Sequence, residues 1–261
     1  MKVGIVLSGG GIRGIAHFGV LKALKDAGLV ISNISGTSAG AIVGALYANG
    51  VDPYEAFEII KKTSLLRFLR PAIGFPALFN FEHIFDLLKE YLPHNSFEKL
   101  KIPLTITATD FNVGKLTYFN EGELIRKVLA SSCVPGIFSP VIIDGISYID
   151  GGVLNNFPVE PLIGKCDYII GSSCNNLPYL DKFKNIKNVL QRAAVLSLNY
   201  DVAEKLRYID FFIEPKDLGA TSLFDVKKTE AIYKIAFEET NKKICENVSF
   251  LEIIKQSKMV D

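Results

Sequence analysis

Strand-like and helix-like segments alternate through the first fifty residues. Residues 3–7 (VGIVL) form a continuous apolar run, which is typical of a strand buried on both faces. Apolar residues then recur at helical spacing over 12–27, a short strand-like segment follows at 31–35, and a small apolar helix is expected at 39–49. Strand–helix–strand–helix in this order predicts a parallel sheet covered by helices, and therefore an α/β fold.

The rest of the chain continues this alternation without a break that would mark a second domain. Residues 52–92 are mostly helical in pattern, with an interruption by RPAIGFP at 70–76. No Gly/Ser-rich or Pro-rich linker and no internal repeat is present, so a single domain over residues 1–261 is expected. Further strands are expected at 104–109, 116–119, 141–143, 147–149, 167–171 and 209–213, and further helices at 189–207 and 227–246.

Composition argues against several classes of protein. Lys and Arg total 29 against 28 Asp and Glu, and the net charge of +1 gives no support for a nucleic-acid partner. The four cysteines show no C-x-x-C spacing and there are three histidines, so neither a zinc site nor a disulfide framework is expected. The sequence has no stretch of 18 apolar residues and no signal-peptide pattern. We expect a cytoplasmic protein without a membrane-spanning helix, a metal or a cofactor.

The first strand runs into a glycine-rich loop, GGGIRGI at 9–15, which fits G-x-G-x-x-G through Gly9, Gly11 and Gly14. A dinucleotide site needs an acidic residue at the end of the next strand to bind the ribose, and here that strand ends in NISG. A P-loop needs G-K-[ST], which is missing. Nucleotide binding is therefore disfavoured, and what remains is a nest of backbone N–H groups that can face an anion.

The second strand leads into GTSAG, a G-x-S-x-G motif centred on Ser38 at a strand-to-helix junction. This is the context of a nucleophile elbow, in which flanking glycines permit a sharp turn that lifts the serine above the strand end. The alternative is a small-residue turn with Ser38 as an ordinary N-cap, and the motif alone does not separate the two. Beside a nucleophilic Ser38, the anion facing the glycine loop would be the oxyanion of a tetrahedral intermediate.

A serine nucleophile needs a base, and the histidines supply no obvious one. None of His17, His83 and His94 occupies the late position of a hydrolase triad, and each is better explained as a packed or surface residue. Asp150 stands out instead, at the end of a predicted strand and before two glycines in SYIDGGVLNNFP. Strand ends are where α/β folds collect catalytic groups. The alternative is an ordinary Asp-Gly turn.

Three ordered blocks resemble the patatin-like phospholipase family: SGGGIRGIAHFGVLKAL, GTSAGAIVGALYANG, and the segment at 130–159 that contains D-G-G. The resemblance covers most of the chain and is loose after about residue 177. It implies a three-layer α/β sandwich with a mostly parallel central sheet, as in patatins and lysophospholipases. The site residues that it implies are Ser38 as nucleophile, Asp150 as its base without a histidine, Gly9, Gly10 and Gly11 as oxyanion donors, and Arg13 as a contact for a lipid phosphate.

Such a dyad makes demands on its surroundings. A carboxylate with the usual pKa of ~3.9 is a poor base for a serine, so the site should be dry and Asp150 should be buried and hydrogen-bonded to Ser38. For Arg13 the alternative is a solvated side chain that caps the loop. The hydroxyl residues near the motifs are expected to be structural hydrogen-bonders: Ser35, Thr37, Ser131 and Ser132.

The resemblance implies a serine lipid acyl hydrolase of the phospholipase A or lysophospholipase type that works through an acyl-enzyme. Its substrate would be a phospholipid, a lysophospholipid or another fatty-acyl ester, reached by transient contact with the inner membrane face. Two alternatives stay open: a lipid acyltransferase or transacylase, and a catalytically silent lipid-binding regulatory protein. The aromatic segment at 65–85 is either a mobile lipid-facing flap or a buried helical excursion.

Overall fold

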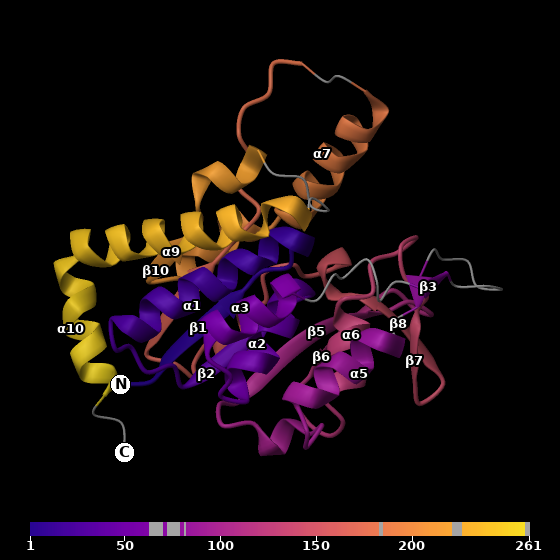
Figure 1. Cartoon of the computed structure of the whole chain (residues 1–261), viewed down its shortest axis with the longest axis horizontal. Helices are drawn as coiled ribbons and strands as arrows, with labels where there is room; N and C mark the ends of the chain where they lie inside the picture. The colour runs from indigo at the N-terminus through magenta and orange to yellow at the C-terminus, as the bar shows by residue number, and fades with distance from the viewer. Residues whose placement is uncertain (63–69, 72–78, 81, 183–184, 221–225, 259–261) are drawn as a thin grey trace.

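A mixed α/β architecture is seen in the computed structural model, which describes residues 1–62, 70–71, 79–80, 82–182, 185–220 and 226–258 (Figure 1). The strands are β1 Val3–Leu7, β2 Asn33–Gly36, β3 Arg70–Pro71, β4 Phe79–Asn80, β5 Leu104–Asp110, β6 Lys115–Phe119, β7 Val141–Ile143, β8 Ile146–Asp150, β9 Tyr168–Ser172 and β10 Phe211–Ile213. The α-helices are α1 Ala16–Asp26, α2 Ala39–Ala48, α3 Pro53–Lys62, α5 Glu82–Tyr91, α6 Ile125–Ser131, α7 Ile186–Leu198, α8 Val202–Lys205, α9 Thr229–Glu246 and α10 Val248–Ser257. Short 3-10 helices include η1 Gly11–Ile15, η3 Gly151–Val153, η4 Glu160–Leu162 and η6 Lys216–Ala220.

The central sheet is mostly parallel, as expected. Its hydrogen-bonded order begins β10-β9-β1-β2-β5, and all four of these pairings are parallel. The antiparallel strands β6, β7 and β8 complete it next to β5. Leu7 pairs with Gly36 on one side and with Ser172 on the other, so β1, β2 and β9 end level with one another. The loops that follow these three strands therefore meet at one edge of the sheet.

The meeting of β2 with β8 is the feature of this sheet that most matters for the site. Gly36 of β2 pairs with Ile106, Asp150 of β8 pairs with Ala108, and β6 pairs with β5 over the whole of 106–110. Since β6 occupies one edge of β5, β2 and β8 share the other edge and approach each other end to end. Asp150 therefore lies beside the end of β2 on an antiparallel strand. Its position was expected from the rule that α/β folds collect catalytic groups at the ends of parallel strands, and that rule does not explain it.

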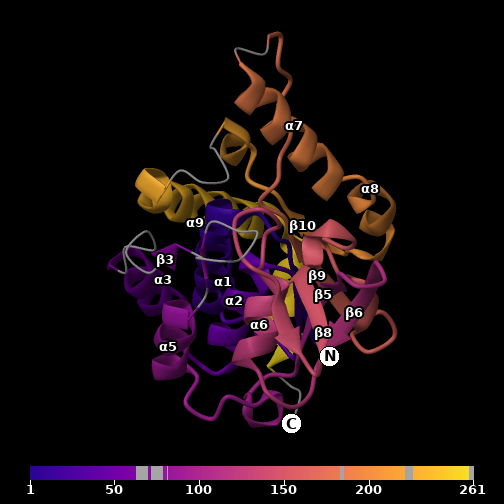
Figure 2. The ribbon, with the colours of Figure 1, turned by 90° about the vertical axis from the view of Figure 1, so that its right-hand side faces the viewer.

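Both faces of the sheet are covered, and β1 shows why its sequence is apolar throughout. Ile5 and Leu7 belong to the larger core with helices α1, α2 and α9, whereas Val6 packs in a second cluster with Phe157 and Val202. In Figure 2, α1 and α2 lie on one side of the sheet and α8 on the other. The helix–sheet–helix layering agrees with the expected three-layer sandwich.

Most expected elements are present, with four differences. Within the mostly helical pattern expected at 52–92, β3 and β4 form a two-stranded antiparallel sheet. The helix expected at 12–27 begins as the 3-10 helix η1 and becomes α-helical only at Ala16. The helix expected at 189–207 is divided into α7 and α8, because Asn199 ends α7 and its side chain donates to the carbonyl of Asn175. The helix α10 was not expected. The proposed flap at 65–85 falls mostly outside the described residues.

Candidate active site

Ser38 occupies a sharp turn between β2 and α2. Its backbone angles are φ 54° and ψ −122°, a region that residues with a side chain rarely adopt. The turn requires small neighbours: a Cβ on Gly40 would lie 2.2 Å from the carbonyl oxygen of Leu7, and a Cβ on Gly36 would lie 2.6 Å from the carbonyl oxygen of Gly40. Ser38 therefore occupies the sharp strand-to-helix turn that the G-x-S-x-G spacing predicts, and its role as a nucleophile stays a prediction.

Neighbouring hydroxyl groups hold this strained turn. The N–H of Ser38 donates to Ser131 Oγ at 2.9 Å, and Ser132 Oγ donates to the carbonyl of Ser38 at 3.1 Å. Thr37 Oγ1 donates to the carbonyl of Asn155 at 2.9 Å. Each of these hydroxyl groups satisfies a buried backbone group, which is the structural role expected for them.

The hydroxyl of Ser38 donates to Asp150 Oδ2 at 2.6 Å, and both residues are 6% exposed. The other carboxylate oxygen of Asp150 accepts from the N–H of Gly152 at 2.7 Å. Burial raises the pKa of Asp150 to about 6, against the opposing effect of these two hydrogen bonds. The predicted contact between the two side chains is thus present in a dry setting.

The glycine loop passes directly beside Ser38. A Cβ on Gly9 would lie 3.1 Å from Ser38 Cβ and 2.3 Å from Asn156 Oδ1, so the close approach favours glycine. The N–H of Gly9 already donates to the carbonyl of Asn156 at 3.1 Å. The N–H groups of Gly10 and Gly11 donate to no acceptor within the described part of the chain, which leaves these two as the donors that can serve an oxyanion.

A family model for patatin-like phospholipases matches residues 5–163, which contain the glycine loop, the elbow and Asp150. The chain belongs to the patatin-like phospholipase family.

Curated relatives are similar to parts of this chain, and a solved structure shares its fold. An uncharacterised NTE family protein of Mycobacterium tuberculosis is 36% identical over 177 residues, which are 67% of this chain and 49% of that protein. Lysophospholipase NTE1 of Coccidioides immitis is 35% identical over 165 residues, 60% of this chain and 10% of that protein. The patatin-like chain thus spans about half the length of the first relative and a tenth of the second. VipD from Legionella pneumophila shares the fold, with a TM-score of 0.62 at 15% identity over 94% of this chain and 67% of that one.

Arg13 of the patatin-like loop points into the protein. It is 3% exposed, and its guanidinium donates to the carbonyl of Gly219 in η6 at 3.3 Å. Burial lowers its pKa. The alternative of a solvated arginine is therefore wrong, and a contact with a lipid phosphate stays a prediction.

His17 is a packed residue and not a candidate base. Its Nε2 lies 2.8 Å from the carbonyl of Ser8, which requires a proton on that nitrogen, so Nδ1 accepts from Ser172 Oγ at 2.8 Å. Burial lowers the pKa of His17 to about 4. His94 is exposed, and the side chain of His83 lies outside the description. His17 ties the end of β1 to the end of β9.

The burial of neutral His17 predicts a loss of stability in acid. An unfolded histidine gains a proton near its ordinary pKa of 6.5, whereas the folded one resists until about 4, so the stabilisation is complete above pH 6.5 and lost as the pH falls toward 4. The loss is roughly 3 kcal/mol. Urea unfolding of the wild type and His17→Gln should show their difference in free energy of unfolding shrinking by this amount between pH 7 and pH 4. A constant difference would contradict the expectation.

Sequence reasoning missed two asparagines beside the glycine loop, Asn156 and Asn175. Both are buried, and both side-chain amides donate to the carbonyl of Gly9. Each belongs to an Asn-Asn pair that follows a strand and its turn, in VLNNFP and SSCNNLP. That repeated pattern was the available signal, because amides that become buried must find hydrogen-bond partners.

Lys205 was missed as well, and it supports the segment after Asp150. Its buried ammonium group donates to Asn155 Oδ1 at 2.6 Å and to the carbonyl of Phe157 at 3.1 Å, and it pairs with Asp201 at 2.7 Å. The carbonyl of the same Asn155 accepts from Thr37, next to Ser38. A cation from α8 therefore helps to fix the chain on both sides of the candidate dyad.

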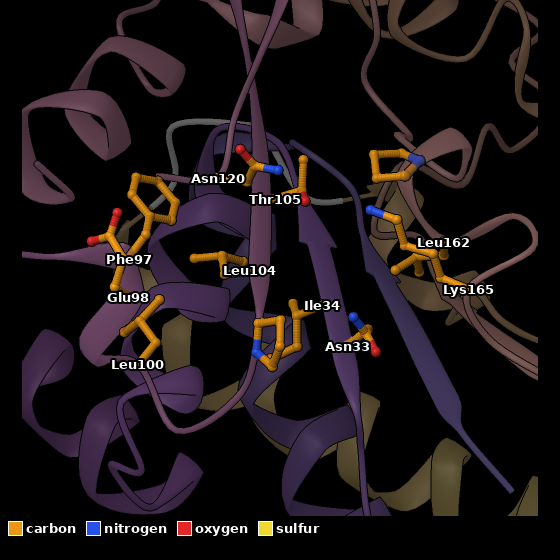
Figure 3. Close-up of a pocket in the computed structure, with 12 residues that line it drawn as sticks. Asn33, Ile34, Phe97, Glu98, Leu100, Leu104, Thr105, Asn120, Leu162 and Lys165 are labelled. Atoms are coloured by element: carbon orange, nitrogen blue, oxygen red, sulfur yellow. The ribbon is translucent and has the colours of Figure 1, made fainter. Parts of the chain in front are cut away.

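A hollow of about 270 Å³ lies at the other end of the sheet (Figure 3). Asn33 and Ile34 begin β2, and Leu104 and Thr105 begin β5, so these lining residues lie at the amino ends of strands whose carboxyl ends approach Ser38. Lys165 also lines the hollow. This hollow is therefore separate from the candidate active site.

No three His, Cys, Asp or Glu side chains within the described residues gather as metal ligands would. None of the helices in the same part of the chain is both long enough and apolar enough to cross a membrane.

Proposed function

We propose that this patatin-like chain is a serine lipid acyl hydrolase of the phospholipase A or lysophospholipase type, with Ser38 and Asp150 as its catalytic dyad. The single observation that carries the proposal is the 2.6 Å hydrogen bond from Ser38 Oγ to a buried carboxylate. A pKa raised to about 6 makes Asp150 a stronger proton acceptor than an exposed aspartate, while leaving it ionised at neutral pH.

In the first half of the proposed reaction, Ser38 Oγ attacks the ester carbonyl carbon and passes its proton to Asp150. The carbonyl π bond opens, and the resulting oxyanion accepts hydrogen bonds from the N–H groups of Gly10 and Gly11. The positive end of the α2 dipole, which lies beside Ser38, also stabilises the negative charge. The bond to the leaving oxygen then breaks, and that oxygen takes the proton from Asp150 and departs as an alcohol or lysolipid. The products are an acyl-Ser38 ester and an ionised Asp150.

In the second half, a water molecule loses a proton to Asp150 and attacks the acyl carbon. The second tetrahedral intermediate uses the same N–H groups. When it collapses, Ser38 Oγ leaves and recovers the proton from Asp150, and a fatty acid is released. The dyad is thereby restored without a histidine at any step.

The substrate class rests on the family and on the names of the relatives. Relatives over part of this chain are called lysophospholipases, so we propose a fatty-acyl ester of a phospholipid or lysophospholipid as substrate. We also propose that the whole chain, 1–261, acts as one domain, because Asn175 and Lys205 lie beyond the matched residues 5–163 and contact the loops of the site.

Labelling with a fluorophosphonate tests the proposal. The wild type should form one covalent adduct at Ser38, located by peptide mass mapping, and Ser38→Ala should form none. Wild-type protein should also release fatty acid from lysophosphatidylcholine, and product analysis should find the acyl group on water even when a lysolipid acceptor is added. Ser249→Ala, which removes an exposed hydroxyl group from α10, is the matched control and should keep the label.

Two results would refute the proposal. Folded wild type that takes no label, with or without detergent micelles, would show that the elbow carries no active nucleophile. Transfer of the acyl group to the lysolipid in preference to water would instead establish an acyltransferase.

A further inference from the structure

The carbonyl oxygen of Gly9 is held by donors from two distant segments of the chain. Asn175 Nδ2 donates to it at 2.6 Å, Asn156 Nδ2 at 3.4 Å and Cys174 Sγ at 3.5 Å. Asn175 is 0% exposed and Asn156 is 3% exposed, so these hydrogen bonds are made in a dry setting. A carbonyl surrounded in this way has a fixed direction.

The direction of this carbonyl determines where the next N–H points. The described chain contains no cis peptide bond, so the peptide between Gly9 and Gly10 is trans and planar. The N–H of Gly10 therefore points away from the Gly9 carbonyl and from the side-chain amides that hold it. It donates to no acceptor within the part of the chain that the structure describes.

A loop of three consecutive glycines needs this external restraint. Gly9, Gly10 and Gly11 have no side chains that could pack and fix their dihedral angles, and glycine adopts positive and negative φ almost equally well. A rotation of the Gly9–Gly10 peptide would exchange the positions of its carbonyl and its N–H. An oxyanion site would then lose a donor and meet the negative end of a carbonyl dipole.

We propose that Asn175, assisted by Asn156, is a positioning residue that holds the Gly9–Gly10 peptide so that the Gly10 N–H serves the oxyanion. This inference rests on the proposed function. The nitrogen atom of each amide donates to the Gly9 carbonyl, and the two amide oxygen atoms have no hydrogen-bond partner among the described residues. Asn175 follows β9 and lies outside residues 5–163, which match the family model.

The test compares Asn175→Leu, which keeps the shape and removes the donor, with the smaller Asn175→Ala. The matched control is Asn176→Ala, because the neighbouring amide donates to Glu214 and not to Gly9. Each protein is titrated with fluorophosphonate, so that kcat on a p-nitrophenyl ester is expressed per active site. Inhibition by a trifluoromethyl ketone, which forms a tetrahedral adduct with a serine, reports on the oxyanion site directly.

Both Asn175 variants should lower kcat per titrated site by about 10- to 100-fold, while KM stays within about twofold of the wild type. Inhibition by the trifluoromethyl ketone should weaken by a similar factor. Asn176→Ala should match the wild type in all three quantities. An unchanged kcat per site in Asn175→Leu would overturn the inference, and so would an equal loss in Asn176→Ala. Wild type that neither hydrolyses the ester nor labels at Ser38 would refute the proposed function itself, before any variant is compared.

Discussion

Replacing Asp150 by asparagine should lower kcat by about 10³-fold and, at the same time, make the folded protein more stable above pH 6. The loss of activity follows because an amide cannot take the proton of Ser38. Asparagine has the same shape as aspartate, and its oxygen can still accept from the N–H of Gly152. The variant should therefore keep the fold of the site and lose only the proposed base.

The gain in stability follows from the raised pKa. The pKa of Asp150 is about 6 in the folded protein against a model value of 3.8, so the folded state binds its proton more tightly than the unfolded chain does. The cost of holding the ionised group is absent below pH 3.8, grows as the pH rises from 3.8 to 6, and is complete above 6. Its size is roughly 3 kcal/mol, and an uncharged asparagine does not incur it.

Urea unfolding at pH 8 and pH 4, together with ester hydrolysis at pH 8, measures both effects. Asp150→Asn should be more stable than the wild type at pH 8 and close to it at pH 4. The matched control is Asp86→Asn on the exposed side of α5, which should alter neither property. A variant that loses activity and also loses stability at pH 8 would contradict the proposed cost of the buried carboxylate.

Replacing Gly40 by alanine should destabilise the protein by about 3 kcal/mol or more. The added Cβ would lie 2.2 Å from the carbonyl oxygen of Leu7 and 2.7 Å from that of Ser8. Both are backbone atoms at the end of the central strand β1, so no side chain can rotate to make room. The helix α2 would have to move away from the sheet, and Ser38 at its start would move with it.

Gly44 on the same helix offers the matched control. A Cβ there would lie 3.2 Å from a methyl group of Ile34 and 3.2 Å from one of Leu104, which are side-chain atoms that can shift. Gly44→Ala should stay within about 1 kcal/mol of the wild type, since alanine also favours the helix. Thermal and urea unfolding of both variants measure their stability, and equal stability of the two would refute the backbone clash.

The candidate dyad could be predicted from the sequence because each half is local. Glycines lie two residues before and two residues after Ser38, and two glycines follow Asp150 directly. These glycines indicate sharp backbone turns that few other residues permit. What brings the two side chains together is not local. The end-to-end meeting of β2 and β8 depends on β6 occupying the other edge of β5, and no short pattern in the sequence encodes such an arrangement.

The contacts from the C-terminal third were beyond reach for the same reason. The partners Asn175 and Gly9 are 166 positions apart, and nothing near either residue indicates the other. For Arg13 the solvated alternative was wrong, because its guanidinium is buried and donates to the carbonyl of Gly219 in η6, a residue far from it in the sequence. Periodicity also predicted one helix where the hydrogen bond from Asn199 to Asn175 divides α7 from α8.

The order of the strands has a consequence for how the protein is made. The central strand β1 is the first to be synthesised, and its register partner for Val3 in β9 is Tyr168. At about 5 to 20 residues per second, roughly 10 to 30 seconds separate the two on the ribosome. Through that interval β1 lacks one of its two neighbours, and the glycine loop lacks Asn175, which follows Tyr168 in the sequence. The proposed hydrolase activity should therefore arise only after β9 and Asn175 have emerged.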